Sequence, residues 1–360
     1  MIPVTKPFLP PYEEYQGFIQ KVWARNWLTN NGPLVNELEV KLKAYLDVPH
    51  MLYLTNGTIA IQLAIKALDL KGEVITTPFS YVATTSSLVW ENCEPVFVDI
   101  DERSFNIDPS LLEAAITDKT TAILATHVYG NPCAIDAIAA IADRHGLKVI
   151  YDAAHCFGTK FRGRSVYNYG DVATTSFHAT KLFQTIEGGA VFSQDAELIY
   201  RMSKMRNFGH NGPDSFDGVG INGKNSEFHA AMGLSNLPYV EDILTKRKSD
   251  HERYNYWLDK LNLQQPYVAP EATYNYSYYP IVFDDKATTD LVFRKLAENE
   301  IFARRYFYPI LSSLDYVKKT ATPVAESIAE RVLCLPLYHS MGDAEIDMVS
   351  RIILRTVRFG

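Results

Sequence analysis

Between residues 50 and 193, short apolar runs rich in β-branched residues alternate with stretches of helical periodicity. Met51–Leu54 has the composition of a buried strand, and Thr58–Leu70 then places apolar residues on one helix face. Repeated alternation of this kind predicts an α/β fold with a mostly parallel sheet and helices on both faces. Because ligands bind at the carboxyl ends of such strands, functional residues should directly follow the apolar runs. Further strands are expected at Glu73–Thr77, Pro95–Ile100, Thr121–Val128 and Lys148–Ala154, and further helices at Val82–Glu91, Pro109–Ile116 and Ile135–His145.

After residue 171 the alternation ends. Two strand-like runs, 171–177 and 188–193, enclose a loop that carries Lys181. A helix is expected over 226–261, bent or broken near Pro238, because proline cannot continue the hydrogen bonds of a helix. About the last hundred residues mix strand and helix patterns. We therefore predict a large α/β domain over residues 1–240 and a smaller C-terminal α+β domain over residues 241–360.

Composition limits the class of protein. Of the 360 residues, 47% are hydrophobic and 21% charged, which favours a sizeable buried core over disorder. The formal net charge of -7 argues against a nucleic-acid partner, which would require a basic surface. The four cysteines are scattered without zinc-site spacing, so we expect reduced thiols and no metal. Without a signal-peptide pattern or an apolar run of about 20 residues, we expect a cytoplasmic protein without membrane contact.

Three of the predicted strands are followed by side chains that could bind a ligand. Gly57 and Thr58 open a helix, where free N–H groups and a hydroxyl suit a phosphate. Asp152 ends another apolar run, and a carboxylate there can pair with a protonated ring nitrogen. Tyr81 follows a third run and could stack on a planar ring. Each also has an ordinary explanation, respectively an N-cap turn, a turn-capping carboxylate and a core aromatic.

A fourth feature is the stretch SFHATK, which places Ser176 and Lys181 on either side of His178. Lysine forms Schiff bases with carbonyl compounds once its amine is deprotonated, although a solvated loop lysine is the commoner case. Together and in this chain order, the four features supply a phosphate cradle, a stacking ring, an acid for a pyridine nitrogen and a lysine for an aldehyde. That combination predicts pyridoxal 5'-phosphate (PLP) as cofactor, with Lys181 and Asp152 as catalytic residues.

The chain resembles the sugar-nucleotide aminotransferases of the DegT/StrS type, which have the fold type I architecture of PLP-dependent transferases. The resemblance runs from WLTNNGP to LPLYHSM, and its most specific element is SFHATK followed by EGGAV. It implies that Lys181 binds the aldehyde of the cofactor and that Ser176 binds its phosphate. Asp152 is the implied partner of the pyridine nitrogen. In the same DAAH segment, His155 is the implied neighbour of the 3-hydroxyl of the cofactor.

Two further segments resemble the phosphate site of the family. NGT matches the phosphate turn, with Asn56 where the family usually has serine, so that Gly57 and Thr58 are the better matches. Asn222, in GINGKNSEFHAA, matches the segment through which the neighbouring subunit reaches the phosphate. The resemblance therefore implies a homodimer with shared active sites.

The resemblance also implies the reaction, which is transfer of an amino group from L-glutamate to a nucleotide-linked keto sugar. The N-terminal run and TTPFSYVATTSS are most similar to members that aminate C4 of dTDP-4-keto-6-deoxyglucose. The product, dTDP-4-amino-4,6-dideoxyglucose, feeds O-antigen and other surface polysaccharides. UDP-linked 4-keto sugars and dTDP-linked 3-keto sugars stay open as alternatives. The candidate substrate contacts are Thr29, Asn30 and Tyr308, each of which could equally cap a loop or pack.

Two other classes of protein stay open at this stage. A PLP-binding regulator without turnover would normally need an added DNA-binding module, for which the chain has neither spare length nor a basic segment. A nicotinamide-dependent sugar oxidoreductase is suggested by GVGING, residues 218–223, which matches the dinucleotide motif GxGxxG. That segment follows a polar loop rather than a strand, which disfavours dinucleotide binding.

Overall fold

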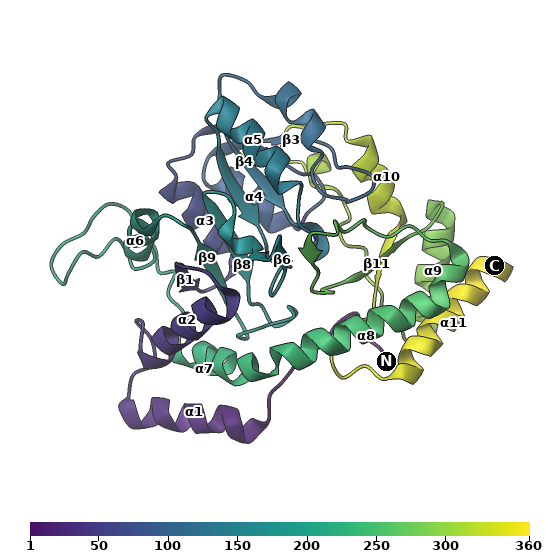
Figure 1. Cartoon of the computed structure of the whole chain (residues 1–360), viewed down its shortest axis with the longest axis horizontal. Coiled ribbons are helices and arrows are strands. Elements are labelled where there is room, and N and C mark those ends of the chain that lie inside the picture. The colour runs from purple at the N-terminus through teal and green to yellow at the C-terminus, as the bar shows by residue number, and fades with distance from the viewer.

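A seven-stranded sheet forms the centre of the molecule in the computed structural model, which describes residues 1–360 (Figure 1). Its strands are β1 (Met51–Leu54), β2 (Gly72–Thr76), β3 (Cys93–Phe97), β4 (Thr120–Thr126), β5 (Lys148–Asp152), β8 (Val172–Ser176) and β9 (Gly189–Phe192). Their order across the sheet is β1-β9-β8-β5-β4-β2-β3. Only β9 runs antiparallel to its neighbours, so the predicted mostly parallel sheet is confirmed.

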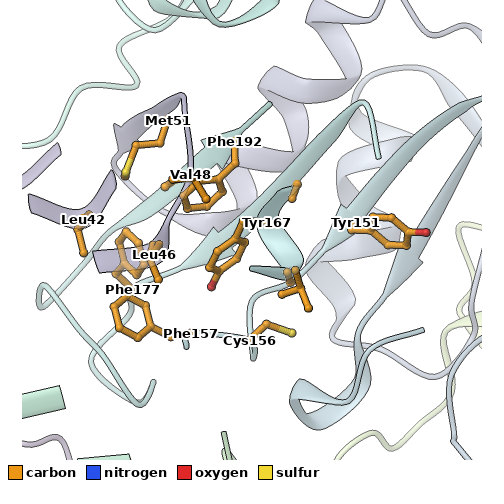
Figure 2. Packing of buried hydrophobic residues seen from close by; sticks show 14 of the residues in the cluster. Leu42, Leu46, Val48, Met51, Tyr151, Cys156, Phe157, Tyr167, Phe177 and Phe192 are labelled. Carbon is orange, nitrogen blue, oxygen red and sulfur yellow. The ribbon is translucent and has the colours of Figure 1, made fainter. Parts of the chain in front are cut away.

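Both faces of the sheet are covered by apolar packing. In β5, Val149 and Tyr151 belong to a cluster of 39 buried residues on one face, whereas Ile150 belongs to a cluster of 19 on the other. Figure 2 shows part of the larger cluster, where the rings of Tyr167 and Phe192 stack with centroids 4.2 Å apart. Helices α2 (Pro33–Leu46), α5 (Ile135–His145) and α7 (Glu227–Asn236) complete the larger cluster, and α3 (Gly57–Ala67), α4 (Val82–Trp90) and α6 (Ala196–Met205) complete the smaller.

Two helices precede the first strand, α1 (Tyr12–Arg25) and α2. The sequence prediction did not include them, although Leu34, Leu38 and Leu42 of α2 recur at helical spacing and are buried. The start of α2 is fixed by the buried carboxylate of Glu227, which accepts hydrogen bonds of 2.9 Å from the N–H groups of Leu34 and Val35. A negative charge at a helix N-terminus stabilises the helix, so α7 holds α2 in place.

The predicted helices had different outcomes. The break near Pro238 is confirmed, because α7 is followed by a 3₁₀ turn at Leu237–Tyr239 and then by α8 (Val240–Leu258). The helix predicted at Pro109–Ile116 is wrong, since that stretch forms two separate 3₁₀ turns. Only Leu112 in it is buried, so packing does not favour a regular amphipathic helix there. None of the helices is both long and apolar enough to cross a bilayer.

The C-terminal part packs around its own cluster of 18 buried residues. Its strands β11 (Tyr279–Val282) and β12 (Val332–Leu335) pair antiparallel, and α9 (Lys286–Glu298), α10 (Pro323–Arg331) and α11 (Asp343–Phe359) surround them. The N-terminus also lies in this part of the molecule, because Ile2 joins the cluster and bridges to Ile301 (Figure 1). The predicted domain boundary at residue 240 therefore stays a prediction. The first residues of the polypeptide pack with the residues that follow this boundary.

Candidate active site

A cavity of about 430 Å³ opens at the carboxyl ends of the central strands. Its wall includes Thr126, Asp152 and Ser176, the last residues of β4, β5 and β8. This is the edge at which parallel sheets bind their ligands. The cavity brings together seven residues that were predicted from the sequence, namely Gly57, Thr58, Tyr81, Asp152, His155, Ser176 and Lys181.

One end of the cavity is the first turn of α3. Asn56 caps that helix by accepting a hydrogen bond from the N–H of Ile59 at 2.8 Å, which leaves the N–H groups of Gly57 and Thr58 unpaired. The side chain of Ser176 lies against the turn, since a Cβ at Gly57 would be only 3.0 Å from that of Ser176. Unpaired N–H groups and nearby hydroxyls at a helix N-terminus form a cradle for a phosphate.

The glycine pair after the Lys181 loop makes this cradle possible. A Cβ at Gly189, the first residue of β9, would lie 2.4 Å from the carbonyl carbon of Asn56. No real Cβ atom tolerates such a contact with backbone, so only glycine lets β9 pass this close to the turn. The second half of the SFHATK…EGGAV segment is therefore explained by packing rather than by chemistry.

Asp152 presents a buried carboxylate to the cavity. Its Oδ2 atom accepts a hydrogen bond of 2.7 Å from the hydroxyl of Thr84, and its Oδ1 accepts one of 3.1 Å from the N–H of Ala154. Burial raises the pKa of Asp152, whereas the hydrogen bonds from Thr84 and Ala154 and the charge of Lys181 lower it. The remaining lone pairs of the carboxylate are available to a proton donor in the cavity.

Lys181 lies in the loop between β8 and β9, half-buried in the cavity wall. Its Nζ atom is 3.5 Å from the hydroxyl of Tyr278. Burial lowers the pKa of Lys181, and the charge of Asp152 opposes that shift. A lowered pKa increases the fraction of neutral amine, the form that attacks an aldehyde and accepts a proton.

Two rings are available to hold a flat ligand. Tyr81 is 55% exposed at the cavity and does not contribute to the core, so its ring is free to stack. His155 is buried, its ring stacks on Phe307 at 5.7 Å, and its Nδ1 atom has no hydrogen-bond partner in the protein. An unpaired buried nitrogen is costly unless a ligand satisfies it.

These observations fit PLP. The α3 turn and Ser176 suit its phosphate, Asp152 its pyridine nitrogen, Lys181 its aldehyde, and the unpaired nitrogen of His155 a further polar group of the ring. The residues fit PLP in their chemistry as well as in their position, because each polar group of the cofactor has a residue that can bind or react with it.

Four predicted site residues lie outside this cavity. Thr29 and Asn30 are exposed in the turn between α1 and α2. Tyr308 is exposed beneath the guanidinium of Arg305, 5.5 Å from its ring centroid, although the nearby Tyr306 and Phe307 do line the cavity. Asn222 is exposed at the base of the long loop after α6, where its backbone bridges to that of Asn207. The loop itself projects from one side of the molecule (Figure 1). Their roles therefore stay predictions, and only contacts with a substrate or a second chain would bring them to the chemistry.

Sequence reasoning missed other cavity residues. The C-terminal part contributes four residues to the cavity wall, namely Tyr278, Arg304, Tyr306 and Phe307. No local sequence motif indicates this contribution. Thr84 does not line the cavity but donates a hydrogen bond to Asp152, and it was missed because its only signal is its position one helical turn after Tyr81. An orienting partner for a catalytic carboxylate could have been sought there, since hydroxyls often perform this task.

The dinucleotide motif at residues 218–223 is not in a dinucleotide-binding context. The segment is an irregular part of the loop after α6, no strand leads into it, and the next helix begins only at Glu227. The dinucleotide motif requires a strand, a tight turn and a helix N-terminus in immediate succession. The oxidoreductase alternative therefore has no structural support.

Comparisons with known proteins agree with this geometry. The model of the DegT/DnrJ/EryC1/StrS aminotransferase family matches residues 12–354. A dTDP-4-amino-4,6-dideoxy-D-glucose transaminase of Escherichia coli is 40% identical over 98% of both chains, and one of Shigella dysenteriae is 41% identical over 96% of both. Among solved structures, DesI in the presence of its TDP-sugar product superposes with a TM-score of 0.93 at 34% identity, covering 99% of this chain and 93% of that one.

These matches confirm the predicted fold type, the PLP cofactor and an aminotransferase activity. They span the helices before the sheet, the cavity and the C-terminal part alike, so the likeness is that of whole chains. The chain belongs to the DegT/DnrJ/EryC1/StrS aminotransferase family.

Proposed function

We propose that the protein transfers the amino group of L-glutamate to C4 of dTDP-4-keto-6-deoxyglucose, producing dTDP-4-amino-4,6-dideoxyglucose. The observation that carries this proposal is the 40% identity, over nearly the full length, with a relative named for that product. The cavity supports it, because its polar groups match PLP and the lysine that amino transfer requires is present. A sugar nucleotide also matches the ligand named with the structural neighbour DesI.

Lys181 performs the proton transfers in this proposal. Its Nζ atom would hold the cofactor, and as a free amine it would accept the proton from the α-carbon of the donor and donate a proton in return. Burial lowers the pKa of Lys181, which favours the neutral amine that a general base must offer. The hydroxyl of Tyr278, 3.5 Å from Nζ, accepts a hydrogen bond from the amine and so helps to orient it. When bound, PLP supplies a ring that stabilises negative charge on the carbon that loses its proton.

Asp152 and the α3 turn hold the cofactor in register with Lys181. The ionised carboxylate of Asp152 keeps a proton on the pyridine nitrogen, and the hydrogen bonds from Thr84 and Ala154 fix its orientation. The N–H groups of Gly57 and Thr58 and the hydroxyl of Ser176 anchor the phosphate end. Because these groups lie at the ends of secondary-structure elements, they would hold both ends of the cofactor in a fixed place relative to the lysine.

We also propose a homodimer in which Asn222 of one subunit reaches the phosphate site of the other. The loop after α6 supports this, because its apolar side chains Phe208, Phe216, Val219 and Ile221 are all exposed. Exposed apolar side chains gathered on one projecting segment are typical of an interface. The four cysteines are buried and unpaired, in keeping with the reducing cytoplasm, where we place the enzyme. Its product would be used for O-antigen or related surface polysaccharides.

The dimer proposal makes a direct prediction. Sedimentation should give twice the 40.7 kDa mass of the chain, and Asn222→Ala should weaken PLP binding by about ten-fold while leaving the dimer intact. Asn211→Ala, on the same exposed loop, is the matched control and should bind PLP as the wild type does. An active monomer, or equal effects of the two variants, would contradict the shared site.

The substrate is tested with a panel of keto sugars. Incubation with L-glutamate and dTDP-4-keto-6-deoxyglucose should give a product aminated at C4, identified by mass and NMR. UDP-linked 4-keto sugars and dTDP-linked 3-keto sugars should react at least about ten-fold more slowly, because mismatched polar groups lose their partners in the site. If one of those sugars reacts fastest, the substrate assignment fails while the aminotransferase assignment stands.

A further inference from the structure

A series of buried hydroxyls, two of them from residues in the cavity wall, leads to Asp152. The hydroxyl of Thr84, in the first turn of α4, lies 2.7 Å from Oδ2 of Asp152. The hydroxyl of Ser80 lies 2.8 Å from that of Thr84, and the hydroxyl of Thr126 lies 2.9 Å from that of Ser80. Neither Ser80, Thr84 nor Thr126 exposes more than 2% of its surface.

The series of hydroxyls ends at Thr126, on the strand next to that of Asp152. Thr126 ends β4, Asp152 ends β5, and the two residues face each other in the register of the sheet. The N–H of His127 also donates to the backbone carbonyl of Asp152 at 3.0 Å. The three hydroxyls and the carboxylate therefore form a loop that starts and ends on adjacent strands, which leaves little freedom for the carboxylate to rotate.

The carboxylate of Asp152 determines which group donates in each of these three hydrogen bonds. An ionised carboxylate only accepts hydrogen bonds, so Thr84 must donate its single proton to Asp152. Thr84 can then only accept from Ser80, and Ser80, having given its proton, can only accept from Thr126. Three aligned dipoles thus point their positive ends towards the carboxylate, and hydrogen bonds in such a series strengthen one another.

We propose that Thr126, Ser80 and Thr84 are positioning residues that keep Asp152 ionised and aimed at the pyridine nitrogen of the cofactor. Asp152 needs such support because it is buried, and burial alone favours the neutral acid, which cannot keep a proton on the pyridine. Charge-assisted hydrogen bonds are the strongest that a hydroxyl can make, so Thr84 is the member with the largest effect.

The other titratable groups around Asp152 contribute little to keeping its carboxylate ionised. Lys181, across the cavity, favours the ionised carboxylate, but its own pKa is lowered by burial. Cys133 and Cys156 are kept neutral because burial raises the pKa of each thiol. His127 and His155 are neutral as well, because burial lowers the pKa of each imidazole, that of His127 to about 3. Two supports therefore do not depend on Lys181, namely the hydrogen-bonded hydroxyls that end at Thr84 and the N–H of Ala154, and Thr84 has the larger effect on the pKa of Asp152.

The test uses two adjacent threonines. Thr84→Val removes the hydroxyl that donates to Asp152, while Thr85→Val removes an equally buried hydroxyl that has no hydrogen-bond partner. Thr84→Ser restores the donor. The dissociation constant of PLP is measured from pH 5.5 to 8.5 by titrating the cofactor-free full-length chain. The same free PLP is present in every titration, so differences between the curves belong to the protein.

PLP affinity should fall as pH decreases and Asp152 becomes protonated. In Thr84→Val the fall should move to higher pH by about one unit, which is about a ten-fold loss of affinity at the acid end. Ser80→Ala should move it in the same direction by less, and the curves of Thr84→Ser and Thr85→Val should follow the wild type. An equal loss at every pH in Thr84→Val, or the same shift in Thr85→Val, would overturn the proposal.

Discussion

Lys181→Ala should abolish amino transfer, with a loss of about 10³-fold or more in kcat. The amine at Nζ has two tasks, since it binds the cofactor and moves the proton, and no other lysine lines the cavity to replace it. The absorbance band of the lysine-linked cofactor should be absent from the variant, and adding L-glutamate should not convert its cofactor to the aminated form. Both effects are measured in one spectrophotometric titration.

Two controls separate chemistry from charge and from general damage. Lys181→Arg keeps the positive charge but not a nucleophilic amine, so it should be as inactive as the alanine variant. Lys160→Ala removes an exposed lysine of the small strand β6 (Lys160–Phe161) and should leave turnover and spectrum unchanged. Full activity in Lys181→Ala would contradict the role of Lys181 in the proposed mechanism.

Asp152→Asn should lower kcat by about 10²- to 10³-fold, because the site then lacks the negative charge that keeps the pyridine nitrogen protonated. The side chain keeps nearly the same shape, so the cavity should remain intact, although the single oxygen of the asparagine can accept from either Thr84 or Ala154 and not from both. Stopped-flow measurement of the reaction with L-glutamate alone should show the loss already in the first half of the cycle, before any sugar is added.

The same substitution should not destabilise the cofactor-free protein. Burial raises the pKa of Asp152 above its value in the unfolded chain, so folding costs more once the carboxylate ionises. The contribution of Asp152 to stability is therefore lost as pH rises from its unfolded towards its folded pKa. Asparagine does not ionise, so at pH 7.5 the variant should melt no lower than the wild type. A large drop in Tm would mean that lost activity reflects unfolding instead.

The sheet and the contents of the cavity could largely be predicted from the sequence. Parallel strands buried on both faces give continuous apolar runs, such as Val149, Ile150 and Tyr151 of β5, and they end at one edge of the sheet. Asp152 and Ser176 directly follow such runs, so their meeting in one cavity follows from topology. The SFHATK segment then added Lys181 by resemblance to a family whose chemistry requires a lysine.

The rest depended on contacts between segments far apart in the chain. Arg304 and Tyr306 line the cavity although they belong to the C-terminal part. Their segment is joined to the loop after β2 by a hydrogen bond of 2.8 Å from the N–H of Leu311 to the carbonyl of Pro78. Thr84 acquires its role only through a residue 68 positions later. Neither relation leaves a periodic or local signal, which is why neither was predicted.

The central claim is that Lys181 is the residue that holds PLP, and one measurement tests it directly. The purified protein is incubated with PLP, reduced with borohydride, digested and examined by mass spectrometry. We expect one pyridoxyl adduct, on the peptide that contains Lys181, and its disappearance when L-glutamate is added before reduction. An adduct on another lysine, or none at all, would contradict it.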